Sequence, residues 1–168
     1  MKKVLSLVLL TALSLATFSC KKDNTMRVEY CELGIVLHDG FEPYDHGEIF
    51  NAAYSDGRTV VGIRRYSFVD CFEYGFLSTY TPEKFAEVYL DKFGLEASGG
   101  VQMHGDVPYF AYTNIDAGGT AYYYMPTFYC TPYAYFVITF ITPASRQVEG
   151  RAEFLTYTST VYILEEYI

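Results

Sequence analysis

The sequence predicts a single α+β domain in which an antiparallel sheet is combined with helices. Tyr and Phe are abundant, with 18 and 13 copies in 168 residues, and these side chains are enriched in strands. Short alternating apolar segments are separated by turns rich in Gly, Pro and Asp, which is typical of strands. Two segments instead have helical spacing. About 150 residues beyond the N-terminal leader fit one domain with one core.

Three strands are expected before the first helix. The break in the first strand is expected at Gly34, and residues 38–47 read as a loop. Asp56-Gly57 predicts a hairpin between the second and third strands, because glycine readily adopts the positive φ of a tight turn. The three strands are expected in residues 28–37, 50–54 and 59–68.

The segment Thr81-Pro82-Glu83 predicts the start of a helix. Thr can cap a helix, Pro is tolerated at the first helical position, and Glu favours the positive end of the helix dipole. Phe85, Tyr89 and Phe93 then recur on one side, and Gly94 ends the helix.

An antiparallel meander and a closing helix are expected after Gly94. Pro126 has no amide hydrogen, so its strand is expected to be an edge strand or to be bulged. The closing helix would bury an apolar face, although Gly150 weakens it. The strands are expected in residues 101–104, 109–114, 121–129 and 133–142, and the apolar face of the helix in Val148, Ala152, Leu155 and Tyr162.

The first 20 residues have the layout of a bacterial lipoprotein signal. Lys2 and Lys3 precede an apolar run over residues 4–18, which is shorter than a membrane span. Residues 15–20 resemble the lipobox of signal peptidase II substrates, although Thr17 and Phe18 depart from the usual pattern. The resemblance implies cleavage after residue 19 and acylation of Cys20, which would hold the protein at a membrane.

The domain organisation and location follow from that signal. Residues 1–19 would be the signal peptide, 20–26 a tether and 27–168 one domain. Lys21 does not resemble the Asp of an inner-membrane retention signal, so the outer membrane is favoured in a source with two membranes. In a source with one membrane the protein would lie on its outer face. The alternative is an ordinary secretory peptide cut nearby, with no lipid attached to Cys20.

The charge of the chain excludes one class of partner. Without residues 1–19, which carry two lysines and no acid, the formal charge changes from −8 to −10. Such a chain repels phosphate backbones, so we expect no nucleic-acid partner.

Three local segments resemble PsbP-like proteins: residues 80–86, 107–110 and 135–140. The similarity covers most of residues 28–163 and extends to the order of strands and helices. It implies a PsbP-like α/β/α sandwich, an antiparallel sheet flanked by helices. The family includes a photosystem assembly subunit, a nuclear import factor that binds a small GTPase and many bacterial lipoproteins. The resemblance implies a binding scaffold and no enzyme, and none of the family's metal or partner contacts matches a position here.

The remaining cysteines are candidates for a disulfide in an oxidising compartment. We expect Cys71 to pair with Cys130, because both are placed near the margin of the sheet, and Cys31 to be a buried strand residue. The absence of any pairing and a nucleophilic cysteine are the alternatives.

Other chemical motifs point to no cofactor or metal. Histidine and acidic residues crowd the segment 38–48, but the spacing matches no zinc or calcium site, so a solvated loop is expected. His104 stands alone, and no nucleophile elbow or SxxK motif is present. We therefore expect a protein that is not an enzyme.

Tyrosines form the remaining candidate binding surface. Tyr122 and Tyr124 point to one face of their strand and Tyr123 to the other, so one face must pack in the core. Tyr133 and Tyr135 follow in the next strand. These side chains either pack against the sheet or contact a protein or a glycan.

Two functions therefore lead. The first is a membrane-tethered envelope lipoprotein that acts as a non-catalytic scaffold for an envelope protein partner. The alternative is a lipoprotein that binds a small molecule or glycan in an aromatic pocket. Hydrolase or redox activity comes last.

Overall fold

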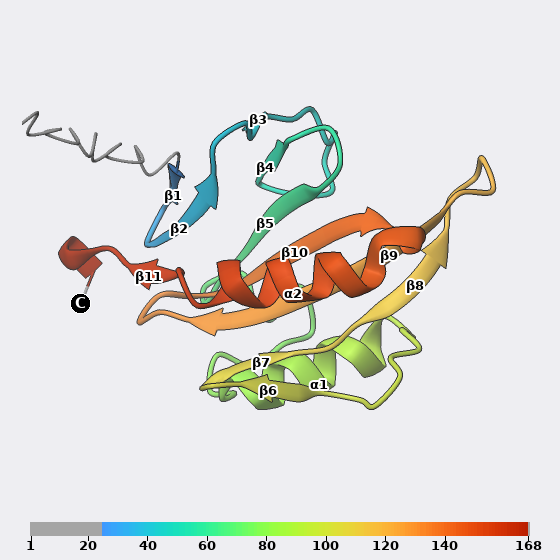
Figure 1. Ribbon diagram of the computed structural model, residues 1–168. Coiled ribbons are helices and arrows are strands. Elements are labelled where there is room, and N and C mark those ends of the chain that lie inside the picture. The colour runs from blue at the N-terminus through green and yellow to red at the C-terminus, as the bar shows by residue number, and fades with distance from the viewer. Residues whose placement is uncertain (1–24, 168) are drawn as a thin grey trace, which may run out of the picture.

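The structure, a computed structural model, describes residues 25–167, in which two antiparallel sheets are combined with two α-helices (Figure 1). The larger sheet has eight strands, in the order β3-β4-β5-β10-β9-β7-β6 with β8 also paired to β9, and the smaller has the order β1-β2-β11. The elements are β1 (Thr25–Tyr30), β2 (Leu33–His38), β3 (Glu42–Pro43), β4 (Ala52–Ser55), β5 (Val60–Ser67), α1 (Pro82–Lys92), β6 (Gln102–His104), β7 (Val107–Tyr109), β8 (Tyr112–Ile115), β9 (Ala121–Cys130), β10 (Ala134–Pro143), α2 (Gln147–Thr158) and β11 (Tyr162–Ile163), with 3-10 helices at Ala144–Arg146 and Glu165–Tyr167. The predicted α+β fold is confirmed.

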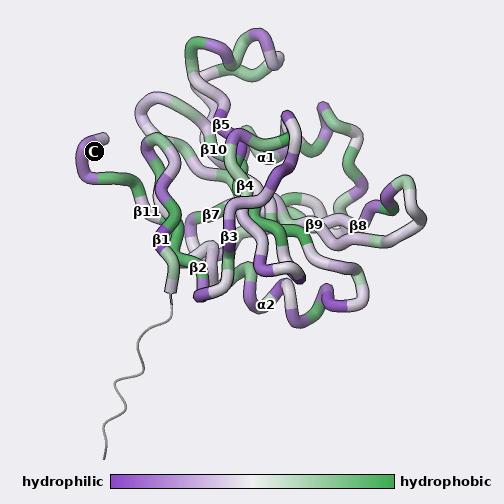
Figure 2. Tube along the Cα trace, turned by 90° about the horizontal axis from the view of Figure 1, so that it is seen from above, coloured by the Kyte–Doolittle hydropathy of each residue, from purple (hydrophilic) through white to green (hydrophobic). Residues whose placement is uncertain are grey.

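The two faces of the larger sheet carry different clusters of buried side chains. Along β10, Phe136, Ile138 and Phe140 face α2 and the smaller sheet, and the alternate residues Tyr135 and Val137 face α1. The layer on the α2 face therefore consists of a helix and the smaller sheet. The prediction expected helices alone to flank the larger sheet. Figure 2 shows hydrophobic colour on strands such as β2 and β9 and hydrophilic residues in many outer turns.

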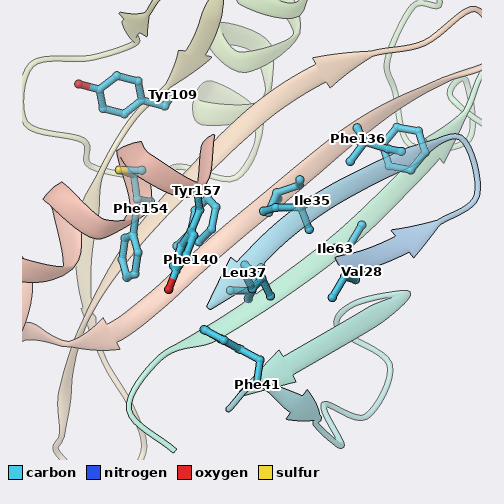
Figure 3. Packing of buried hydrophobic residues seen from close by; sticks show 14 of the residues in the cluster. Val28, Ile35, Leu37, Phe41, Ile63, Tyr109, Phe136, Phe140, Phe154 and Tyr157 are labelled. Atoms are coloured by element: carbon cyan, nitrogen blue, oxygen red, sulfur yellow. The ribbon is translucent and has the colours of Figure 1, made fainter. Parts of the chain in front are cut away.

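The face toward α2 is packed by stacked aromatic rings. Phe140 stacks on Phe154 at a centroid distance of 5.1 Å and on Tyr157 at 6.1 Å. Figure 3 shows these rings beside the aliphatic side chains of β2, including Ile35 and Leu37. The smaller sheet and α2 thus close this face together.

The helix that begins after Thr81 is confirmed in detail. The Thr81 hydroxyl accepts a hydrogen bond from the Lys84 amide at 3.2 Å, and Pro82 occupies the first turn. Gly94 has a φ of +58° just past the helix end. The hairpin at Asp56-Gly57 is also confirmed, with β4 and β5 as its strands.

The first predicted strand is instead a hairpin. β1 begins at Thr25, inside the expected tether, and the chain turns at Cys31-Glu32 before β2 returns beside it. Cys31 is exposed and has a φ of +52°, so the expectation that it is a buried strand residue was wrong. Gly34 lies inside β2, so the predicted break at this residue was wrong. The absence of a Cβ leaves room for the Tyr162 ring, which a Cβ would meet at 2.3 Å.

The closing helix is shorter than predicted and buries a different face. It ends at Thr158, and Tyr162 belongs to β11. Val148 is 80% exposed, whereas Gly150 and Phe154 are buried. A Cβ on Gly150 would lie 2.8 Å from the Thr142 methyl group, so the glycine that weakens the helix allows its close approach to β10.

Pro126 does not lie on an edge strand. β9 pairs with β10 on one side and with β7 and β8 on the other. The missing amide hydrogen is accommodated where β7 ends and β8 has not begun, because residues 110 and 111 leave the ladder there. The Phe110 amide donates to the Pro126 carbonyl at 3.3 Å. The segment predicted as one strand, 109–114, is consequently divided in two.

Candidate binding surfaces

The four tyrosines predicted as one surface lie in three environments. Tyr122 and Tyr124 line a cavity beside the 44–50 loop, and Tyr133 is exposed in the turn between β9 and β10. Tyr135 is fully buried, which raises its pKa to about 12. Its hydroxyl donates to the carbonyls of Leu77 and Tyr80, at 3.1 and 2.7 Å. Tyr135 is therefore a packing residue.

A second surface, which the sequence did not indicate, lies at the end of the sheet beside Tyr133. Val69 and Phe72 are 89% and 82% exposed, in the segment between β5 and α1. Leu77 and Tyr133 are about half exposed. The Phe68 amide donates to the Tyr133 carbonyl at 2.9 Å, which joins the segment to the β9–β10 turn. We call Val69, Phe72, Leu77 and Tyr133 the apolar end surface.

Buried side chains and backbone hydrogen bonds fix the loop that contains Phe72. Cys71 and Phe76 are each 1% exposed, and Phe76 packs edge-on against Phe85 of α1 at a centroid distance of 4.8 Å. The Cys71 amide donates to the Ser67 carbonyl at 2.8 Å, and the Phe76 amide donates to the Cys71 carbonyl at 2.9 Å. Phe72 thus projects outward from a loop that is anchored on both sides.

Acidic side chains border the apolar end surface. Asp70 and Glu73 alternate with Val69 and Phe72 along the same loop, and all four are exposed. A ligand of this surface would therefore meet both apolar side chains and negative charge.

The cavity at Tyr122 and Tyr124 forms an aromatic groove of about 560 Å³. The 44–50 loop forms one wall of the groove. Its Phe50 ring packs over Gly62, where a Cβ would lie 2.5 Å from the ring. Tyr124 stacks on Tyr112 with ring centroids 4.9 Å apart. The aromatic lining of the groove includes Tyr44, Phe50, Tyr122 and Tyr124, and its charged and polar lining includes Asp45, His46, Arg58 and Asp116.

The acidic segment 38–48 is mostly exposed, with Phe41 buried beneath it. Within residues 25–167, no group of three His, Cys, Asp or Glu side chains is placed to hold a metal ion. His38 lies 3.2 Å from Asp56 and 3.5 Å from Glu153, which ties the end of β2 to the β4–β5 turn and to α2. His104 contacts the Ser159 hydroxyl at 3.0 Å on the surface.

A buried ion pair joins the first hairpin to the larger sheet. The guanidinium of Arg65 donates to both carboxylate oxygens of Glu32, at 2.9 Å from Nε and 2.5 Å from Nη2. The Glu32 side chain is only 4% exposed. The hydrogen bonds from Arg65 lower the pKa of Glu32, which therefore stays ionised at neutral pH.

Cys71 and Cys130 belong to the same cluster beneath α1. Burial raises the pKa of both thiols, which disfavours the nucleophilic thiolate. The three cysteines of the described residues are free in this structure. The expected pairing of Cys71 with Cys130 stays a prediction.

Solved structures resemble this chain in fold. A 1.50 Å crystal structure of a Bacteroides thetaiotaomicron VPI-5482 protein has a TM-score of 0.55 at 14% identity and covers 85% of this chain, which spans about half (49%) of that protein. The solution structure of cyanobacterial PsbP (CyanoP) from Synechocystis sp. PCC 6803 has a TM-score of 0.46 at 11% identity, over 84% of this chain and 94% of that one. A PsbP structure is thus among the matches. No protein-family model and no curated protein matches the sequence.

The N-terminal predictions concern residues that the structure does not describe. The signal peptide and Cys20 lie outside residues 25–167, and the tether does so up to residue 24. Among the described helices, none has the length and apolar character that crossing a membrane requires.

Proposed function

We propose that this chain is a lipid-anchored protein of the bacterial cell envelope that binds a protein partner, without catalysis, through the apolar end surface. The observation that carries the proposal is the outward position of Val69 and Phe72 on a loop whose Cys71 and Phe76 are buried. Large exposed apolar patches on otherwise polar proteins mark interaction sites. A loop that is already ordered loses little conformational entropy on binding.

The anchor in this proposal is Cys20. A charged start, an apolar run too short to span a bilayer and Ser19 before the cysteine all support export followed by acylation. The outer membrane is the favoured location in a source with two membranes.

The charges at the rim favour a protein over a membrane as the ligand. Asp70 and Glu73 would be repelled by anionic lipid headgroups, which opposes insertion of Val69 and Phe72 into a bilayer. A protein with an apolar pocket bordered by Lys or Arg complements both the apolar centre and the acidic rim.

The proposal is tested by crosslinking in the cells that make the protein. A photoreactive residue replaces Phe72 in one variant and Val148 in the control, because Val148 is as exposed (80%) but lies on α2. We expect a discrete adduct with one envelope protein from position 72 and none from position 148. Equal labelling at the two positions, labelling by lipid alone, or an adduct with a second copy of the chain would each contradict the proposal.

The aromatic groove supports a second candidate function, the binding of a glycan or small molecule. Aromatic rings flanked by carboxylates and an Arg suit the stacking and hydrogen bonding of a sugar. A stabilising thermal shift across a panel of sugars and lipids would support it, provided that Tyr122→Ala abolishes the shift and Tyr133→Ala, at the other end of the sheet, does not. No shift with any compound, or equal effects of the two variants, would exclude it.

A further inference from the structure

A second cavity, of about 420 Å³, lies beside the start of α2. It shares no lining residue with the aromatic groove or with the apolar end surface. Its volume lies within the range of about 300–1,000 Å³ that is usual for sites of small ligands. The residues that matter for its chemistry are Glu96, Ser98, Gln102, Ala111, Thr113 and Arg151.

Arg151 is fixed in this cavity by two neighbours. Its Nη2 donates to the Tyr109 hydroxyl at 3.0 Å and to Gln102 Oε1 at 3.1 Å, and the Tyr109 hydroxyl donates to the same Gln102 oxygen at 3.0 Å. Tyr109 is 4% exposed, and Figure 3 shows its hydroxyl directed away from the core around Phe154. The guanidinium is thus held in one orientation.

The rest of the guanidinium is available to a ligand. Among residues 25–167, the hydrogen bonds of Arg151 involve Nη2 alone, and Arg151 takes part in no ion pair. The free Nε and Nη1 hydrogens of a guanidinium that is held in place can donate charge-assisted hydrogen bonds to a carboxylate.

The cavity also contains one negative charge. Glu96 is exposed there and, within the described residues, forms no ion pair either, so the two opposite charges do not neutralise each other by contact. The lining also includes the hydroxyls of Ser98 and Thr113 and the methyl group of Ala111, so it has both polar and apolar groups.

We propose that this cavity binds a small zwitterion of the α-amino-acid type, either free or as a short peptide. Arg151 binds the carboxylate, Glu96 binds the ammonium group, and the side chain of the ligand packs against Ala111. A ligand with both charges satisfies both free side chains, whereas a ligand with one charge leaves the other side chain without a partner. This site is independent of the apolar end surface.

Calorimetric titration of the exported protein with three related probes tests the proposal. L-leucine carries both charges, N-acetyl-L-leucine only the negative one and L-leucinamide only the positive one. We expect L-leucine to bind at least about tenfold more tightly than either derivative, which corresponds to about 1.4 kcal/mol.

Variants assign each charge to its partner. Arg151→Gln should weaken the binding of L-leucine and N-acetyl-L-leucine about tenfold and leave L-leucinamide unchanged, and Glu96→Gln should weaken L-leucine and L-leucinamide only. The control is Arg27→Gln, which removes the same charge from an exposed position on β1. If Arg151→Gln lowers the thermal midpoint, Arg151→Lys replaces it and should weaken the binding of the carboxylate, because a flexible ammonium replaces the planar guanidinium that Tyr109 and Gln102 hold.

Three results would overturn the proposal. These are no heat of binding from L-leucine at millimolar concentration, equal affinity for all three probes, or equal effects of Arg27→Gln and Arg151→Gln. Any of them would show that the two charges do not act together on a zwitterion.

Discussion

The two faces of the larger sheet differ in how completely they are covered. The face toward α2 is closed by the helix and by the smaller sheet, and its cluster includes fully buried Ile35, Phe140 and Phe154. The face toward α1 has its own buried cluster, which includes Phe85, Phe128 and Tyr135. The exposed large apolar side chains around it and in its loops include Tyr44, Ile49, Val69, Phe72, Tyr74, Leu77 and Phe93, whereas Val148 and Ile163 lie on elements that cover the other face.

Buried residues on the α2 face contribute mainly to stability, whereas exposed apolar residues on the α1 side are available for binding. Closing the α2 face removes apolar surface from water, which is the dominant favourable contribution to folding. The apolar side chains left outside on the α1 side contribute little to folding, so their positions suit contact with a partner. Substitutions of buried residues on the α2 side should therefore mainly lower stability, and substitutions of these exposed residues on the α1 side should mainly weaken binding.

The largest loss of stability is expected from Phe154→Ala on the closed face. The fully buried ring stacks on Phe140, so its removal leaves a cavity and should lower the free energy of unfolding by about 4 kcal/mol, measured by urea denaturation. Phe93→Ala, on a ring that is 48% exposed on the α1 side, should cost below about 1 kcal/mol. Equal losses would contradict the comparison.

Arg65→Met should lower the free energy of unfolding at pH 7 by about 3 kcal/mol, measured by urea denaturation, because it leaves Glu32 buried and unpaired. In the wild type the pKa of Glu32 is lowered, so the stabilisation is full above its unfolded pKa of about 4.3 and is lost as pH falls through the lower folded pKa. The deficit of the variant should therefore shrink below about pH 4. Adding Glu32→Gln should recover part of the loss at pH 7, and a deficit independent of pH would refute the role of the pair.

Gly150→Ala tests the approach of α2 to the sheet. Helix propensity alone predicts a gain of about 1 kcal/mol, because Ala favours helices over Gly. Contact with the buried Thr142 predicts a loss of about 1–3 kcal/mol, since the new Cβ would lie 2.8 Å from its methyl group. We expect a lower thermal midpoint, and a higher one would show that the helix can move away.

Thiol accessibility gives the smallest expected effect. In the native protein Cys31 should react quickly with a maleimide, whereas Cys71, 1% exposed, should react slowly. If Cys71 and Cys130 pair after export, denaturation without a reductant should add no further reactive thiol. Labelling of both after denaturation would exclude the disulfide.

The sequence predicted the elements whose signals are local. The helix after Thr81 and the hairpin at Asp56 follow from hydrogen bonds within a few residues, such as those that the Asp56 carboxylate accepts from the Arg58 and Thr59 amides. The first hairpin was missed because its turn, Cys31-Glu32, has neither Gly nor Pro and depends on the ion pair of Glu32 with Arg65, 33 residues away.

The candidate binding surfaces depend more on tertiary structure than these local elements do, so less of them could be predicted from the sequence. Tyr122, Tyr124 and Tyr133 were identified from their residue type, but a strand pattern cannot tell which part of a sheet face a helix covers. Phe72 was missed because an apolar residue in an aromatic segment resembles a core residue. Its one signal is the absence of any alternating or helical period in residues 67–80.

The affinity of the purified crosslinked partner for three forms of the protein tests the central claim most directly. Phe72→Ser should weaken binding by at least about 30-fold, the loss expected of an aromatic residue at the centre of an interface, and should leave the thermal midpoint nearly unchanged. Val148→Ser, an equally exposed position on the closed side, should bind like the wild type. Wild-type affinity in Phe72→Ser would contradict the assignment of the apolar end surface as the binding surface.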